Sequence, residues 1–333
     1  MSLALLPILL LATPSTITPL HTYTALSGRP TWLDSLMFCL GMQAPLTPSS
    51  LNEGEYPAVA AMTTGYVFRV ENQATVMYLQ RIGKTGHLTT LDVSSVAAGA
   101  NRPWGLPGWY TIMYLPLLVP AHALLISAPL ASDRFFMRST LLLLLSRLLS
   151  VASFRARTSP SWHGEAEPGV KGDLLVLLSE DRWVRMKGAV DDLKAVTSGS
   201  WLSRPRYPML CDLADWTARS LVYIAAVALA GVTDQGKIVL VLCTFIAHGV
   251  LAVHNALTKE LVMNERVVKV SGAPGSVKEY PRRLVMAREL VKEMGRSDFA
   301  VRLGMMNPDD PHLKTHDGDN ANAKTPAEEV VTM

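Results

Sequence analysis

The chain has 333 residues, more than the roughly 100–200 of one typical domain, so we expect more than one structural zone. Hydrophobic residues make up 49% and charged residues 18%, with a mean hydropathy of +0.22, which is apolar for a water-soluble protein and ordinary for one partly dissolved in lipid. A net charge of only +3 without one tight polybasic cluster argues against a nucleic acid partner, and three widely separated cysteines give neither a disulfide framework nor a zinc-binding spacing.

Two features precede the first long apolar segment. Residues 1–12 (MSLALLPILLLA) resemble the apolar core of a signal peptide, but they contain Pro7 and lack a basic leader, so a signal or anchor role stays open. Residues 65–82 have aromatic and β-branched runs on either side of the polar stretch 71–73, which predicts a small β-hairpin.

The first pair of predicted membrane spans lies within residues 108–154. Residues 108–130 are long enough to cross a hydrocarbon layer of about 30 Å, and Pro116 and Pro120 predict a kink. Residues 139–154 are rich in leucine but contain Arg147, whose cost of roughly 2.5–3.5 kcal/mol at mid-bilayer the leucines only modestly outweigh. We favour a span over an interfacial helix, because Arg147 can face a partner helix or extend toward the helix end.

The second pair of predicted spans comprises residues 216–232 and 237–257, and the short break between them predicts an antiparallel hairpin. Small residues in the first of these, such as Ala225 and Ala226, permit the close approach of another helix. Arginine and lysine flank the central region and follow the second hairpin, so the positive-inside rule predicts a cytosolic central region and C-terminus. The N-terminal region is cytosolic with four spans and faces the other side with three or five.

Smaller pieces are expected outside the spans. Residues 173–193 predict a short buried strand or helix followed by a helix. Apolar residues recur at helical spacing over 284–294, which predicts an amphipathic surface helix, with the membrane as one place for it to rest. The stretch from residue 307 onward, rich in Asp, Asn, Pro and Lys, is predicted to be disordered.

Two short motifs suggest chemistry. The sequence IGKTG at 82–86 is similar to the end of a phosphate-binding loop, but Tyr78 stands where the full pattern requires glycine, so we favour a plain turn. The sequence HLTTLD has the H-x4-D spacing of membrane acyltransferases, in which the carboxylate orients the imidazole base; here the residues are His87 and Asp92. Eight histidines make a chance pair easy and no matching acceptor motif follows, so we favour a loop histidine near a strand.

Histidines also occur inside the fourth apolar segment. His248 and His254 are six residues apart, which places them about 120° apart around a helix, so they do not readily share one metal ion. We expect His254 near the lipid boundary and His248 hydrogen-bonded to another helix. A structural role is favoured over a proton or ion pathway, for which His122 offers a second polar group. No catalytic, cofactor-binding or metal-ligating residue is assigned.

Three strings resemble a known family: LLSEDRWVRMKGAVDDLKAVTSGSWL at 177–202, SLVYIAAVALAGVTDQGKIVL downstream of it, and DFAVRLGMM at 298–306. The chain resembles here a family of uncharacterised fungal integral membrane proteins. The resemblance covers roughly the C-terminal half and brings no catalytic motif. It implies membrane residence and leaves the activity open.

We therefore expect a mainly α, multipass helical membrane protein with about four transmembrane helices, small cytosolic α/β segments and an amphipathic C-terminal helix. The expected regions are an N-terminal region with a signal or anchor candidate and a β-hairpin (1–107), a first transmembrane pair (108–154), a cytosolic segment (155–215), a second transmembrane hairpin (216–257), a cytosolic amphipathic helical region (258–306) and a disordered tail (307–333).

The expected function is that of a non-enzymatic membrane component or a subunit of an assembly. Its expected partners are the lipid bilayer and, through helix packing, copies of itself or other chains, with no cofactor and no nucleic acid. Two alternatives stay open: a small transporter or channel element that uses His122, Arg147 and His248, and a membrane acyltransferase centred on His87. The sequence does not indicate which membrane is involved.

Overall fold

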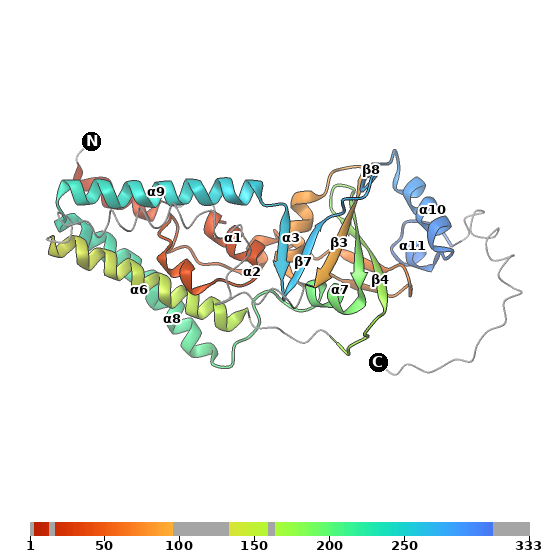
Figure 1. Ribbon diagram of the computed structural model, residues 1–333, viewed down its shortest axis with the longest axis horizontal. Coiled ribbons are helices and arrows are strands. Elements are labelled where there is room, and N and C mark those ends of the chain that lie inside the picture. Colours follow the sequence, from red (N-terminus) through yellow and green to blue (C-terminus); the bar gives the residue numbers. More distant parts are fainter. Residues whose placement is uncertain (1–2, 13–16, 96–132, 159–163, 309–333) are drawn as a thin grey trace, which may run out of the picture.

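The computed structural model describes residues 3–12, 17–95, 133–158 and 164–308. The molecule is elongated, with a bundle of long helices at one end and a β-sheet in the middle (Figure 1). Two helices, α10 (Arg283–Met294) and α11 (Asp298–Arg302), lie at the end opposite the bundle.

Three long helices form the bundle: α6 (Arg134–Arg157), α8 (Pro208–Ala228) and α9 (Asp234–Leu257). Each is long and apolar enough to cross a membrane, α8 together with the single turn η4 (Leu229–Gly231) that continues it. Helices therefore occur at three of the four predicted spans. The remaining predicted span, at 108–130, lies outside the described residues.

The start of α6 and the α8–α9 turn meet at one end of the bundle. Asp133 caps α6, because one of its carboxylate oxygens accepts from the backbone nitrogens of Phe135 and Phe136 at 2.9 and 3.1 Å. The other oxygen accepts from the backbone nitrogen of Thr233 at 2.9 Å, immediately before α9. We call this the distal end, and the end next to the sheet the proximal end.

N-terminal residues complete the bundle with η1 (Leu3–Leu11), α1 (Pro19–Ser27) and η2 (Trp32–Leu36). Leu20, Tyr23, Met37 and Phe38 are buried in the same apolar cluster as residues of the three long helices. The side chain of Asn255 on α9 donates to the carbonyl of Pro19 at 2.7 Å. The start of the chain is thereby packed along the bundle.

The sheet has eight strands in the order β2-β1-β4-β5-β3-β7-β6, and β8 also pairs with β3. Strands β3 and β5 are parallel, whereas the other neighbours are antiparallel. The strands are β1 (Ala58–Ala61), β2 (Val67–Arg69), β3 (His87–Ser95), β4 (Lys171–Leu178), β5 (Arg182–Ala189), β6 (Glu260–Met263), β7 (Arg266–Val270) and β8 (Val277–Glu279).

This mixed sheet shows that the predicted fold class, a mainly α multipass bundle, is wrong. The strands come from three stretches of chain, 58–95, 171–189 and 260–279, and the candidate spans α6, α8 and α9 separate these stretches. Strand pairing over such distances leaves no local pattern in the sequence, whereas a long apolar helix does.

Two local predictions also fail. The predicted hairpin at 65–82 is one short strand followed by α3 (Gln73–Ile82), because the side chain of Asn72 accepts from the backbone nitrogen of Thr75 at 3.1 Å and caps a helix there. The region 258–306, expected to be helical, contains three strands before α10. Asn264 and Glu265 form a two-residue hairpin turn with φ of 47° and 62°, the positive values that match strand twist.

Helices cover both faces of the sheet. One face packs against α1, α3 and α7 (Val190–Thr197), and the other against α10 and α11. A four-residue helix, α2 (Pro48–Leu51), lies beside α3. The predicted amphipathic helix is α10, and its apolar residues Ala287 and Leu290 are buried toward the sheet core and not on a membrane surface.

Candidate functional site

The acyltransferase-like pair is not brought together. His87 and Asp92 lie five residues apart on β3, and because successive side chains of a strand alternate, the two point to opposite faces of the sheet. The Nδ1 atom of His87 lies 2.8 Å from the carbonyl oxygen of Thr85. Of the neighbouring residues 82–86, Ile82 ends α3 and the other four form the turn before β3, with Gly86 at φ 72°.

The polar residues of the predicted spans have separate surroundings. Arg147 is 4% exposed and donates to the backbone carbonyl of Asp34 in η2 at 3.1 Å, so an N-terminal segment covers it. His254 meets the ring of Tyr23 edge-on at 5.6 Å between centroids. His248 is half-buried on α9. His122 lies outside the described residues.

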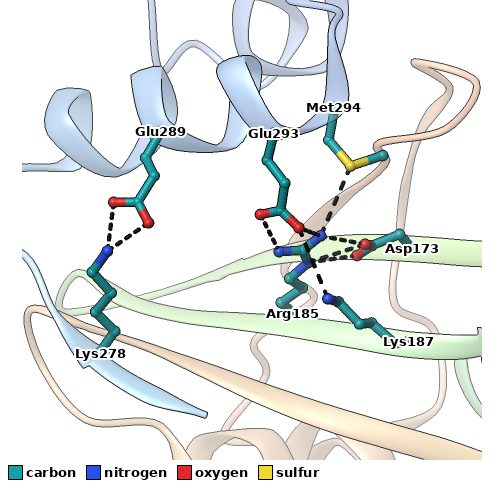
Figure 2. A network of polar contacts seen from close by, with 7 residues as sticks. All are labelled: Asp173, Arg185, Lys187, Lys278, Glu289, Glu293 and Met294. Carbon is teal, nitrogen blue, oxygen red and sulfur yellow. Dashed lines mark hydrogen bonds and ion pairs between the residues drawn. The ribbon is translucent and has the colours of Figure 1, made fainter. Parts of the chain in front are cut away.

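A charged network joins the sheet to α10 (Figure 2). The guanidinium of Arg185 on β5 donates to both carboxylate oxygens of Asp173 on β4, at 2.6–3.0 Å, and to both oxygens of Glu293 on α10, at 2.7 and 2.8 Å. Burial alone lowers the pKa of Arg185, but the hydrogen bonds and charges of Asp173 and Glu293 outweigh it and hold that pKa above its ordinary value.

A second ion pair runs beside the first. Lys278 on β8 donates to Glu289 on α10 at 2.7 Å, and Lys187 lies 4.0 Å from Glu293 (Figure 2). A cavity of about 250 Å³ lies between these side chains and the loop 271–276. Every charged side chain in the network faces one of opposite charge, so the arrangement fastens α10 to the sheet.

Another polar cavity, of about 90 Å³, lies in the proximal half of the bundle. We call it the arginine cavity, because guanidinium groups from α6 and α8 form much of its wall. Its lining residues are Leu20, His21, Met42, Ala44, Pro45, Leu46, Arg147, Ser150, Phe154, Arg157, Leu202, Asp215 and Arg219.

Ion pairs and helix geometry hold the wall of the arginine cavity in place. Arg157 bridges two carboxylates of α8, Asp212 at 2.7 Å and Asp215 at 2.9 Å. The Nε atom of Arg219 donates to the backbone carbonyl of Asp215, one turn earlier, at 3.1 Å. Ser153 also donates to the carbonyl of Cys211 at 3.4 Å, so α6 and α8 are tied together beside the cavity.

His21 on α1 faces the same cavity and is 4% exposed. Burial first, and the nearby charge of Arg147 second, lower the pKa of His21 from 6.5 to about 4. The imidazole is therefore neutral near pH 7. The same wall includes Met42 and Phe154, so the polar groups face an otherwise apolar space.

Within residues 3–12, 17–95, 133–158 and 164–308, no group of three or more His, Cys, Asp or Glu side chains is placed to hold a metal ion. No family model, no curated protein and no solved structure matches the chain.

Sequence reasoning identified only part of the arginine cavity. Arg147 was visible as a charge inside a leucine run, whereas His21 and Arg219 were not identified as cavity residues, because each looks ordinary in its own segment. One usable signal was present on α6: Arg147, Ser150, Phe154 and Arg157 follow the spacing of one helix face. That face is mixed polar and apolar, which indicates an inward-facing polar site.

Proposed function

We propose that the chain is an integral membrane component without catalysis of its own, an adaptor or subunit whose mixed α/β domain is held at the cytosolic face of a bilayer. The observation that supports this best is the outward face of the bundle, where large apolar side chains point away from the other described residues. They are Leu141, Leu145 and Leu148 on α6, Leu213, Tyr223, Ile224 and Val227 on α8, and Ile238, Leu242, Phe245, Ile246, Val253 and Leu257 on α9.

The exposure of these side chains favours lipid over water as the surrounding solvent. Val227, for example, is 75% exposed, and only 28–33% of the most apolar stretch of each candidate span is buried. Soluble monomers rarely expose contiguous apolar patches larger than a few hundred Å². Lipid chains remove the cost of this exposure, because they contact apolar side chains without ordering water.

The cations support a cytosolic sheet domain. Positive residues that flank the proximal end of the bundle are Arg155, Arg157, Arg204, Arg206 and Lys259. Those at the distal end are Arg134, Arg138 and Lys237. Because lysine and arginine accumulate on the cytosolic side, we propose that the proximal end and the sheet face the cytosol.

The strand pairing supports an even number of crossings between β3 and β4. Residues 58–95 and 171–189 belong to one sheet and so must lie on one side of the bilayer. The helix α6 supplies one crossing between them. The sequence offers the predicted span at 108–130, outside the described residues, for the second. With α8 and α9 this makes the four spans that we propose.

Cysteine accessibility in sealed microsomes tests this orientation. In a background with Cys39, Cys211 and Cys243 replaced by alanine, we compare Glu180→Cys in the β4–β5 hairpin with Asp234→Cys at the distal end. The native side chains are 73% and 63% exposed. We expect an impermeant maleimide to label Glu180→Cys in intact vesicles and Asp234→Cys only after detergent. Equal labelling in intact vesicles, or release of the chain by alkaline carbonate, contradicts the proposal.

Reconstitution tests the absence of transport. Purified chain in liposomes is expected to give no ion flux above that of empty liposomes, since Arg147 is 4% exposed and donates to the carbonyl of Asp34 in η2. A flux that Arg147→Gln abolishes would contradict the non-enzymatic adaptor and favour the transporter alternative.

A further inference from the structure

The wall of the arginine cavity has more cationic than anionic groups. Arg147, Arg157 and Arg219 line it, and Asp215 is the carboxylate among its lining residues. Asp212 pairs with Arg157 from outside, but its side chain is 71% exposed. No carboxylate of the described residues lies within ion-pair distance of the guanidinium of Arg219.

A buried polar atom on the same wall has no partner. The Nδ1 atom of His21 makes no hydrogen bond to any described residue, although the residue is 4% exposed. Such an atom is destabilising, and native structures seldom keep one without a ligand or a structural reason. Because His21 lines the cavity, a ligand there can supply the missing partner, and an acceptor oxygen on that ligand matches the tautomer that carries its proton on Nδ1.

Size and surroundings narrow the chemistry of that ligand. The cavity of about 90 Å³ has room for a small oxyanion but not for an extended organic group. Leu20, Met42, Pro45 and Phe154 form the apolar remainder of the wall, so charge interactions inside it are screened less than in water. Guanidinium groups match the oxygens of a phosphoryl group in geometry as well as charge.

We propose that the arginine cavity binds a phosphate dianion, with Arg219 and His21 donating to its oxygens and Arg147 and Arg157 supplying charge. Three guanidinium groups on one wall favour a ligand that carries more than one negative charge. Two sources share the chemistry, namely inorganic phosphate and the terminal phosphate monoester of a lipid headgroup. The cavity lies among the last three turns of α6, at the end that the proposed function places near the membrane surface. Binding of a lipid headgroup therefore rests on the proposed function, whereas binding of inorganic phosphate does not.

Binding to the full chain is the primary test. The chain is purified in a nonionic, phosphate-free detergent, and its thermal midpoint is followed as inorganic phosphate is added, with chloride at matched ionic strength as the reference. A second arm uses nanodiscs of phosphatidylcholine with or without a minor fraction of phosphatidic acid. A saturable rise with inorganic phosphate assigns the soluble source, and a rise with phosphatidic acid alone assigns the headgroup. No saturable rise in either arm overturns the proposal.

Three variants locate the site. Arg219→Gln removes one charge and is expected to weaken binding about tenfold or more, since it removes a charge-assisted hydrogen bond to the ligand. Ser150→Leu keeps every charge but fills the cavity, and it is expected to abolish binding. Arg138→Gln, an exposed arginine at the distal end of the same helix, serves as the matched control and is expected to bind like the unchanged chain. If Arg219→Gln or Ser150→Leu binds as tightly as that control, the assignment to the arginine cavity is wrong.

Discussion

In the sheet, neighbouring residues of one strand enter two different cores, whereas in the bundle each long helix sends one face inward and the other outward. On β5, Trp183 and Val184 are 2% and 0% exposed although they point to opposite faces. On α8, Val222 is 1% exposed and Val227 is 75% exposed. The sheet thus buries apolar side chains on both of its faces, whereas the bundle helices bury them on one face and expose them on the other.

The two regions differ in whether their apolar side chains are covered by other parts of the same chain. The sheet buries its apolar residues with its own helices, so its stability depends on packing and on the charges that fasten α10. The bundle leaves apolar faces that lipid chains can contact, and the polar residues that it buries include Arg147 and His21. Substitutions in the sheet are therefore expected to change stability through packing and ion pairs, and substitutions in the bundle through its buried polar groups.

The largest expected effect is in the sheet. Arg185→Met leaves Asp173 buried without its partner, and removal of one member of a buried ion pair costs about 3–5 kcal/mol. We expect a lower thermal midpoint of the full chain in nonionic detergent and faster hydrogen exchange in α10. The double variant Arg185→Met with Asp173→Leu is expected to recover most of the loss, because it removes the uncompensated charge.

The matched control is Arg283→Met. Arg283 pairs with Asp181 on the surface, where the side chains are 43% and 57% exposed, and exposed pairs contribute about 0–1 kcal/mol. If Arg185→Met destabilises the chain no more than Arg283→Met does, the network of Figure 2 does not hold α10 in place.

In the bundle, the next largest effect depends on pH. Burial lowers the pKa of His21 to about 4, against 6.5 for the ordinary group. Between these pH values His21 is mostly protonated in the unfolded chain and mostly neutral in the folded chain. The contribution of His21 to the free energy of unfolding is therefore complete above pH 6.5 and is lost as the pH falls toward 4. A shift of this size corresponds to a loss of roughly 3 kcal/mol.

Thermal midpoints between pH 8 and pH 4 in phosphate-free detergent measure this dependence. His21→Asn, which cannot titrate, is expected to flatten the part of the pH dependence between 6.5 and 4. A midpoint that falls equally steeply in His21→Asn would show that other groups, and not His21, set the acid sensitivity of the bundle.

The two regions also differed in how far the sequence predicted them. The helices α6, α8 and α9 were predictable because twenty or so consecutive apolar residues are a local signal that matches the thickness of a bilayer. The sheet was not, since β1 has four residues and pairs with β4 more than a hundred positions later. Its hairpin turns at 180–181 and 264–265 use Glu, Asp and Asn where glycine would have been a clearer signal.

The arginine cavity could be predicted from the sequence only in part. Arg147 stood out because a charge inside a leucine run is costly and demands a reason. His21 precedes it by more than a hundred residues, and its contact with the cavity arises from the packing of α1 against α9 and not from any spacing. A site assembled from α1, α6 and α8 becomes visible only when the three segments are placed together.

The smallest expected effect tests the joint between the two regions. Tyr78 on α3 is 0% exposed, and its hydroxyl donates to the backbone carbonyl of Lys259 at 2.7 Å, between α9 and β6. Tyr78→Phe removes this bond at a cost of about 1 kcal/mol. Slow exchange of the amides around residues 258–263 should then become faster, while the amides of α10 stay as they were. Tyr66→Phe is the control, since Tyr66 is 62% exposed and lies on the edge side of the sheet. A uniform change over the whole chain in Tyr78→Phe would mean that the bundle and the sheet unfold as one unit, and that the contrast between them is one of surface only.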